Sequence, residues 1–188
     1  MSLLARPDPT PVITTERLTL RLPTMADAER VTLMLDNFAV SGNLSRVPYP
    51  YQLTDAKAYL RTRRSDVPPE ETGFAIDLPG VGFIGQVGFH RDHRGNTVLG
   101  YYIGQPFWGR GIMTEAARAV VDWLFDTSDV RRVVSGVFHF NRPSLAIQRK
   151  LGFVETGTSM LHCLARGEDV RHIDTELTRT AWARTPAR

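Results

Sequence analysis

Residues 97–114, TVLGYYIGQPFWGRGIMT, join a predicted strand to a predicted helix through a glycine-rich turn. The strand is expected to occupy 97–103. From 114 to 126 polar residues recur every three or four positions among apolar ones, which predicts a helix buried over most of its circumference. A strand that turns directly into a buried helix is typical of a mixed α/β protein.

The turn itself has the features of an anion site. The first N–H groups of a helix lack intrahelical partners and carry the positive end of the helix dipole, so phosphate oxygens can bind there. Gly109 and Gly111 have no Cβ, which allows close approach of a ligand and a positive φ, and Arg110 can add a charged contact. An ordinary strand-to-helix turn would need the same glycines, so this segment alone leaves both interpretations open.

The other elements extend this unit in both directions. Alternating leucines predict a strand at 17–22, and Thr24 with Asp27 predicts a capped helix start. We expect further strands at 73–78, 81–90, 132–138, 159–165 and 170–177, helices at 24–35, 54–64 and 143–151, and loops at 37–53 and 66–71. The order β-α-α-β-β-β-α-β-α-β-β predicts an α/β (α+β) fold, in which helices pack on a single mixed, mostly antiparallel sheet.

Length and composition indicate one globular domain. A chain of 188 residues with 42% hydrophobic and 23% charged residues can bury one core. We expect the domain to span 14–183, with flexible termini at 1–13 and 184–188 and a solvated tail from Arg179 onward.

Charge, cysteine content and hydropathy restrict partners and compartment. The net charge is +3, but the basic residues are scattered, which argues against nucleic acid as a partner. No segment approaches membrane-spanning length and no signal peptide develops, so we expect no membrane partner and a cytoplasmic protein. Cys163 stands alone, which excludes an intrachain disulfide.

Three other motifs fail on their context. Residues 80–85 match a dinucleotide-binding fingerprint, but a strand and not a helix follows them. The spacing of Gly104 and Gly109 is that of a phosphate-binding loop without its lysine. His90 and His93 lie in a predicted turn without a third ligand, so we expect no metal.

Several spaced motifs, taken together, resemble a known superfamily. They are Gly100-Tyr101-Tyr102-Ile103-Gly104, Phe107-Trp108-Gly109-Arg110-Gly111, Thr114-Glu115-Ala116, Asn141-Arg142-Pro143-Ser144 and Lys150-Leu151-Gly152-Phe153. In this order they resemble the GNAT superfamily of acyl-CoA N-acyltransferases, in particular the branch that contains ribosomal-protein N-terminal acetyltransferases. The resemblance covers about residues 14–183.

The resemblance implies that acetyl-CoA is the co-substrate and assigns roles to individual residues. The pyrophosphate would be held by the backbone N–H groups of Trp108, Gly109, Arg110, Gly111, Ile112, Met113 and Thr114. The pantetheine arm would pair with the strand edge at Tyr102, Ile103 and Gly104. Asn141 would contact the cofactor, and Ser144 would donate a proton to the departing thiolate. Gln148 departs from the pattern, because many relatives carry a catalytic tyrosine there.

The implied reaction is direct attack of a primary amine, either a protein N-terminus or a small molecule, on the thioester. Candidate bases are His162, His172 and Asp174, each of which could equally have a surface or core role. Candidate acceptor-site residues, with loop packing as the alternative, are Arg46, Tyr49 and Tyr51. A non-catalytic CoA-binding sensor or scaffold is the competing hypothesis, suggested by the missing tyrosine. The sequence leaves a homodimer open.

Overall fold

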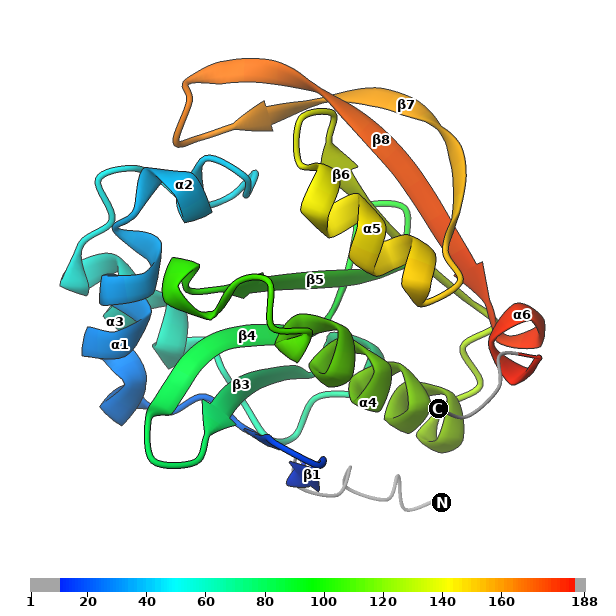
Figure 1. Ribbon diagram of the computed structural model, residues 1–188, viewed down its shortest axis with the longest axis horizontal. Coiled ribbons are helices and arrows are strands. Elements are labelled where there is room, and N and C mark those ends of the chain that lie inside the picture. The colour runs from blue at the N-terminus through cyan, green and yellow to red at the C-terminus, as the bar shows by residue number, and fades with distance from the viewer. Residues whose placement is uncertain (1–10, 185–188) are drawn as a thin grey trace, which may run out of the picture.

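The computed structural model describes residues 11–184, which build an eight-stranded sheet in the order β1-β2-β3-β4-β5-β6-β8-β7 (Figure 1). Neighbouring strands are antiparallel except for the parallel pair β5 and β6. The strands are β1 (Ile13–Thr14), β2 (Thr19–Arg21), β3 (Gly73–Leu78), β4 (Gly82–Arg91), β5 (Thr97–Ile103), β6 (Arg132–Phe138), β7 (Val154–Cys163) and β8 (Glu168–Thr178).

Helices cover both faces of the sheet (Figure 1). The α-helices are α1 (Ala28–Leu35), α2 (Phe38–Ser41), α3 (Leu53–Arg61), α4 (Ile112–Thr127), α5 (Arg142–Lys150) and α6 (Arg179–Ala183), with 3-10 turns η1 (Met25–Asp27), η2 (Pro69–Glu71) and η3 (Gln105–Phe107). We call the side that carries α4 and α5 the α4 face, and the side that carries α1 and α3 the α3 face. None of the helices in this part of the chain is long and apolar enough to cross a membrane.

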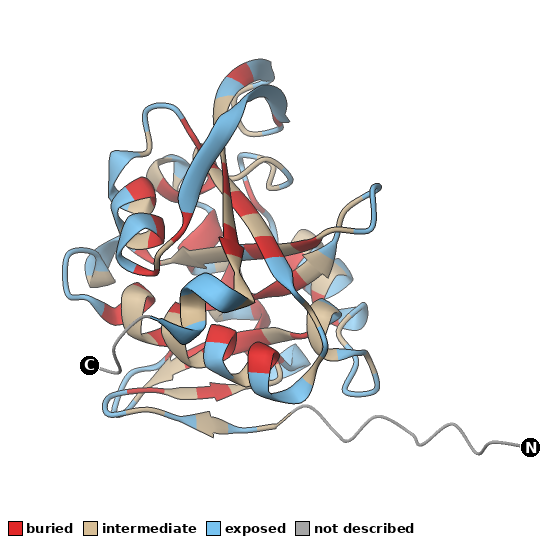
Figure 2. Ribbon diagram, turned by 90° about the vertical axis from the view of Figure 1, so that its right-hand side faces the viewer, coloured by how far each residue is buried: buried red, intermediate tan, exposed pale blue. Residues whose placement is uncertain are grey.

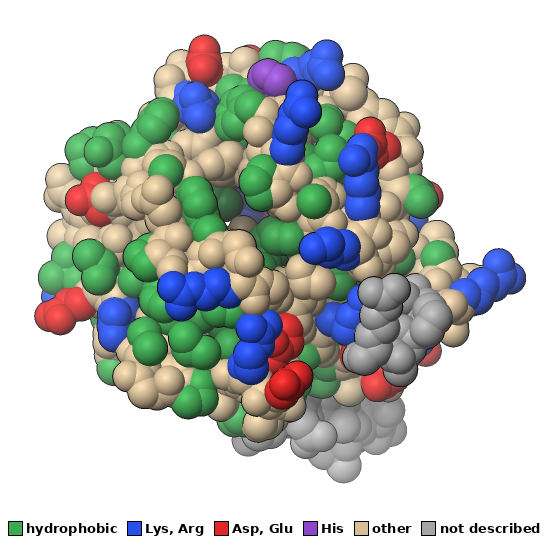
Figure 3. Space-filling model, viewed as in Figure 1, with side chains coloured by type: hydrophobic (Ala, Val, Ile, Leu, Met, Phe, Trp, Pro, Cys, Tyr) green, Lys and Arg blue, Asp and Glu red, His purple; other side chains and the backbone are tan. Residues whose placement is uncertain are grey.

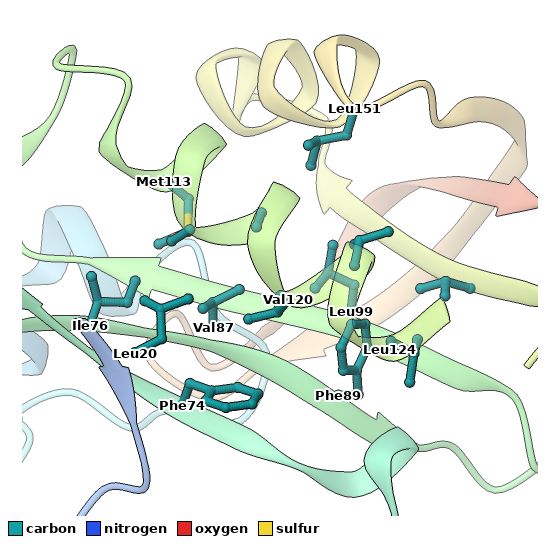
Figure 4. Packing of buried hydrophobic residues seen from close by; sticks show 14 of the residues in the cluster. Leu20, Phe74, Ile76, Val87, Phe89, Leu99, Met113, Val120, Leu124 and Leu151 are labelled. Atoms are coloured by element: carbon teal, nitrogen blue, oxygen red, sulfur yellow. The ribbon is translucent and has the colours of Figure 1, made fainter. Parts of the chain in front are cut away.

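The main core lies between α4 and the central strands. Figure 4 shows Val120 and Leu124 of α4 directed at the sheet, above Phe74 and Phe89. Burial of such side chains contributes roughly 1.5–3 kcal/mol each. A second core on the α3 face contains Val31 and other residues of α1 and α3. The main core fixes α4, and therefore the turn before it, against the sheet.

The outer hairpin is less buried. All residues of β7 except Cys163 are exposed, as Figure 2 shows for much of the outermost part of the sheet. Its tip is fastened to the segment after α2, because the backbone N–H of Leu164 donates to the Ser45 carbonyl at 3.1 Å. The hairpin is thereby attached both to β6, through β8, and to the segment after α2.

The predicted α/β fold class is confirmed, and every predicted strand and helix is present. Several elements differ from the sequence-based boundaries. The predicted loop at 37–53 contains α2, capped by the Asn37 side chain, which accepts from the Ala39 N–H at 3.0 Å. The helix expected from Thr54 begins at Leu53. Beyond Thr178 the chain forms α6 and not a plain solvated tail, and its Trp182 indole donates to Asp122 of α4 at 2.8 Å.

The expectation of flexible termini falls mostly on residues 1–10 and 185–188, which lie outside the described residues. Ile13, expected in the flexible part, pairs with Leu20 as part of β1. β7 also starts earlier than expected, at Val154.

The parallel strands β5 and β6 separate along most of their length, and we call the opening between them the splay. The two strands pair only at Thr97↔Val133 and Val98↔Val134, and then diverge (Figure 1). At the start of the divergence the Ser135 hydroxyl donates to the Leu99 carbonyl at 2.9 Å. Figure 3 shows a deep hollow near the middle of this view, at the level of the divergence, with hydrophobic side chains at its rim and Lys and Arg side chains around it.

Candidate active site

The glycine-rich turn has the backbone conformation expected of an anion site. Gly109 and Gly111 both have φ of +74°, and Gly111 is the N-cap of α4. The first intrahelical bond is donated by Glu115 to the Gly111 carbonyl at 3.1 Å, so the preceding helical N–H groups are left for a ligand. A Cβ on Gly109 would meet no atom within 4 Å, so the space beside the turn is open. The turn thus has the unbonded N–H groups and the open space of an anion site.

Arg17, near the start of the chain, fixes this turn. Its guanidinium donates to the Arg110 carbonyl at 2.9 Å and to the Glu115 carboxylate at 2.7 Å. Burial alone would raise the pKa of Glu115, but hydrogen bonds from Thr15 and Arg17 hold it below its usual value. The ion pair with Arg17 offsets the repulsion that a bare carboxylate in the first helical turn would exert on an anion.

Trp108 has a different role from the one expected. Its backbone N–H donates to the Gln105 carbonyl at 3.2 Å, within η3, and is therefore not free for a pyrophosphate. Its indole N–H donates to the Ile103 carbonyl at 2.8 Å. Trp108 thus fastens the turn to the end of β5, and the N–H groups open to a ligand begin at Gly109.

The strand edge predicted for the pantetheine arm also needs correction. The Gly104 N–H donates to the Ile84 carbonyl of β4 at 2.9 Å. Because strand residues alternate, Tyr102 also directs its backbone to β4, whereas Ile103 and Tyr101 direct theirs to the splay. The edge that faces the opening is therefore formed by Tyr101 and Ile103, and Tyr102 and Gly104 are excluded from it.

Ser144 lies in the first turn of α5, in contact with the phenol of Tyr101. The Tyr101 hydroxyl is 2.8 Å from Ser144 Oγ and donates to the Ser144 carbonyl at 3.2 Å. Burial raises the pKa of Tyr101, which its bonds to Ser144 and Gln148 offset only in part, so the phenol stays protonated. Sequence reasoning missed Tyr101, because only the pairing of strand and helix brings residues 43 positions apart together.

Asn141 forms the start of α5. Its side-chain oxygen accepts from the Ser144 N–H at 3.2 Å, which is an N-cap bond. Its amide nitrogen has no hydrogen-bond partner within the described part of the chain. Asn141 therefore positions Ser144 directly, and its amide can still serve a ligand.

The α3 face of the splay presents two imidazoles. Paired strand residues share a face, so His90, Gly100, Gly136 and His172 all lie on the side opposite Tyr101. A Cβ on Gly100 would lie 3.9 Å from the Cε1 of His90, and one on Gly136 would lie 2.2 Å from the Cε1 of His172. Each imidazole thus lies over a glycine that borders the opening.

The same face holds buried hydrogen-bonding groups that are not satisfied. The Gln86 Nε2 and the Tyr102 hydroxyl are buried and have no partner among the described residues, while the Tyr59 hydroxyl donates to Gln86 Oε1 at 2.6 Å. Buried donors of this kind are costly unless a substrate or solvent oxygen accepts from them. The Gln86 amide and the Tyr102 hydroxyl are thus two donors on the α3 face that no described residue satisfies.

The expected acceptor-loop residues divide into different environments. Tyr51 is buried in the second core, and the exposed Tyr49 packs edge-on against Phe38 with ring centroids 5.4 Å apart. The charge of Arg46 acts on His90. Of the candidate bases, His162 pairs with Asp169 at the exposed hairpin tip, away from the splay.

Comparison with known proteins identifies the family. The family model for the acetyltransferase (GNAT) domain matches residues 17–154, about three quarters of the chain. This protein belongs to the GNAT acetyltransferase family.

Two curated relatives and one solved structure illustrate the similarity. An uncharacterized N-acetyltransferase p20 of Bacillus licheniformis is 25% identical over 152 residues, which cover 76% of this chain and 82% of the relative. The [ribosomal protein uS5]-alanine N-acetyltransferase of Escherichia coli is 32% identical over 108 residues, which cover 56% of this chain and 55% of the relative. The structure of Mycobacterium smegmatis RimJ in complex with CoA-disulfide has a TM-score of 0.74 at 21% identity and covers 93% of this chain and 88% of that chain.

The GNAT domain gives the activity expected from the sequence. The protein is an acetyl-CoA-dependent N-acetyltransferase, which transfers an acetyl group from acetyl-CoA to an amine. Nothing in the fold or the relatives favours the non-catalytic sensor or scaffold.

Proposed function

We propose that acetyl-CoA reaches the splay from the α4 face and that a primary amine reaches it from the α3 face. The open turn at Gly109 and Gly111, at the start of α4, is the observation that supports the first half. The unsatisfied donors of Gln86 and Tyr102 support the second. The thioester would then lie between β5 and β6, with Ser144 on one side and the amine on the other.

The acceptor we propose is an N-terminal α-amine or a small primary amine. The Escherichia coli relative is named for acetylation of an alanine on a ribosomal protein, so a peptide with N-terminal alanine is the first acceptor to test. Thiol release from acetyl-CoA with this peptide, a serine peptide and spermidine tests the proposal. Turnover with none of these amines, or no binding of acetyl-CoA, would count against it. A cytoplasmic location and a homodimer remain proposals from the sequence.

Replacing either Gly109 or Gly111 by Val should abolish binding of acetyl-CoA. A β-branched residue resists a φ of +74° and places methyl groups where the diphosphate would approach. In the unaltered protein, acetyl-CoA at about 100 times its Kd should stabilise the fold by about 2.7 kcal/mol, measured as a rise in Tm. The variants should show no rise.

Gly95→Val is the matched control. Gly95 has φ of +78° in the turn between β4 and β5, and a Cβ there would also meet no atom within 4 Å. This variant has the same backbone strain but should keep the full rise in Tm. Equal rises in all three variants would contradict the proposed pyrophosphate site.

Replacing Ser144 by Ala should lower kcat by about 10² without a comparable change in KM for acetyl-CoA, because a general acid acts only as the thiolate departs. Tyr101→Phe should give a smaller loss, since Ser144 keeps its hydroxyl but loses the phenol 2.8 Å away. Steady-state thiol release with the most active amine measures both. An unchanged kcat in Ser144→Ala would show that the proton comes from elsewhere.

A further inference from the structure

On the α3 face of the splay, the imidazole of His172 is fixed in place by a hydrogen bond to a carboxylate. His172 of β8 has its Nδ1 2.8 Å from the Asp174 carboxylate, and the Ser159 hydroxyl donates to the same carboxylate oxygen at 2.8 Å. The His172 side chain is only 16% exposed. A carboxylate on Nδ1 fixes that nitrogen as the N–H donor and leaves Nε2 with its lone pair.

The place of His172 is set by a glycine. Its Cε1 would lie 2.2 Å from a Cβ at position 136, so the ring occupies the room that Gly136 leaves. Gly136 is two residues beyond the last pair of β5 and β6, where the splay has begun. The ring also meets Phe138 edge-on, with centroids 5.9 Å apart, which limits its rotation.

The two sides of the sheet thus hold different chemical groups. Ser144 and Tyr101 lie on the α4 face, while His172 and Asp174 lie on the α3 face. Attack on a thioester needs a proton acceptor on the side where the amine enters and a proton donor on the side where sulfur leaves. The proton donor Ser144 and the imidazole of His172 therefore lie on opposite sides of the opening between β5 and β6.

We propose that His172, oriented by Asp174, is the general base that accepts the proton of the attacking amine; this inference rests on the proposed function. The new C–N bond forms as the C–S bond breaks, the amine proton passes to Nε2 of His172, and the CoA thiolate takes a proton from the Ser144 hydroxyl. Solvent then removes the proton from His172 and restores that of Ser144. Asp174 positions the ring and stabilises its cation.

His90, the other imidazole over the splay, is disfavoured as a proton acceptor. Burial and then the charge of Arg46 lower the pKa of His90, with Arg63 adding to the effect and Asp92 opposing it. Two cations beside an imidazole disfavour its protonated form, whereas His172 has a carboxylate in direct contact. We therefore assign the proton transfer to His172 and not to His90.

The test compares His172→Gln with His162→Gln. The hairpin tip offers a matched control, because the His162 Nδ1 also lies 2.8 Å from a carboxylate, that of Asp169, but is exposed and lies on the opposite face of the β7–β8 hairpin from His172. With the N-terminal alanine peptide, the serine peptide or spermidine as acceptor, His172→Gln should lose about 10²-fold in kcat, and Asp174→Asn about tenfold with KM unchanged. His162→Gln should keep the unaltered rate. All variants should keep the rise in Tm with acetyl-CoA, which shows that the fold and cofactor site are intact.

Chemical rescue makes the assignment specific to the imidazole. Added imidazole should restore part of the rate of His172→Ala, and it should leave the rate of His162→Ala unchanged. Full activity of His172→Gln, or rescue of His90→Ala in place of His172→Ala, would overturn the proposal while leaving the proposed function in force. If the unaltered protein binds acetyl-CoA but acetylates none of the three amines, the proposed function fails, and this assignment fails with it.

Discussion

Arg21→Met should lower the free energy of unfolding by about 3–5 kcal/mol, because it leaves two partly buried carboxylates without their cation. The Arg21 guanidinium donates to both oxygens of Asp27, at 2.7 and 2.9 Å, and to both oxygens of Asp77, at 2.6 and 3.0 Å. The Asp27 side chain is only 7% exposed. This one cation therefore joins β2, β3 and the start of α1.

Urea unfolding at pH 7 measures the loss, and Arg64→Met is the control. Arg64 also bonds both oxygens of one carboxylate, that of Asp66, but both side chains are exposed. Solvent screens such a pair, so this variant should unfold as the unaltered protein does. A comparable decrease in the free energy of unfolding in both variants would show that the buried ion pairs of Arg21 contribute no more to stability than the exposed pair of Arg64.

The pH dependence of the loss has a definite sign. Burial works to raise the pKa of Asp27, but hydrogen bonds from Arg21 and Thr24 hold it below its usual value. Its contribution to stability is therefore present above the unfolded pKa of about 3.9 and is lost as the pH falls through the lower folded pKa. In Arg21→Met burial should prevail and raise the folded pKa, so that stability falls as the pH rises. The difference between the two proteins should be larger at pH 7 than at pH 4.5.

The regular elements could be predicted from the sequence because their signals are local. The alternating leucines of β2 and the polar spacing along α4 each depend on neighbours within a few residues. The conformation of the turn before α4 was predictable for the same reason, since Gly109 and Gly111 carry the signal for positive φ themselves.

The short elements had weaker local signals. α2 is only four residues long and depends on the Asn37 cap, in a segment whose proline and tyrosine content indicated a loop. α6 exists because Trp182 packs against Phe125 and bonds Asp122, which are partners about 60 residues away. Such contacts leave no pattern in the segment itself.

Only those parts of the candidate site that consist of backbone groups or lie within a single sequence motif could be predicted from the sequence. Ser144 and the turn at Gly109 follow from motifs, and the structure places each at the start of a helix, α5 and α4 respectively. The partnership of Tyr101 with Ser144, and that of Arg17 with the Arg110 carbonyl, joins residues 43 and 93 positions apart. The backbone directions of Tyr102 and Gly104 depend on the register between β4 and β5, which the sequence does not specify.

Gln148, the position at which the superfamily resemblance implies a tyrosine, is a structural residue in this protein. It is 1% exposed, and its Nε2 donates to the Ser135 hydroxyl at 2.9 Å and to the Gly136 carbonyl at 3.2 Å. Its Oε1 accepts from the Thr175 hydroxyl at 2.7 Å. The amide thereby joins α5 to β6 and β8 directly beneath the splay.

Gln148→Leu should therefore lower the free energy of unfolding by about 2–4 kcal/mol, since each buried polar group left without a partner costs about 1–3 kcal/mol. The Thr175 hydroxyl and the Gly136 carbonyl would both be left unsatisfied. Adding Thr175→Val to this variant removes one of the two and should recover about half of the loss in urea unfolding. No recovery would mean that packing, and not hydrogen bonding, sets the role of position 148.

Gln148→Tyr distinguishes a structural from a catalytic position. A phenol is larger than the buried amide and cannot reproduce its three bonds, so we expect a loss of stability of at least about 2 kcal/mol and no gain in kcat. The phenol beside Ser144 is already supplied by Tyr101, 2.8 Å from Ser144 Oγ. A stable Gln148→Tyr variant with a raised kcat would show instead that the proton donor of the reaction is limiting and that position 148 can supply it. With the expected result, position 148 is structural and the phenol beside Ser144 is that of Tyr101 on β5.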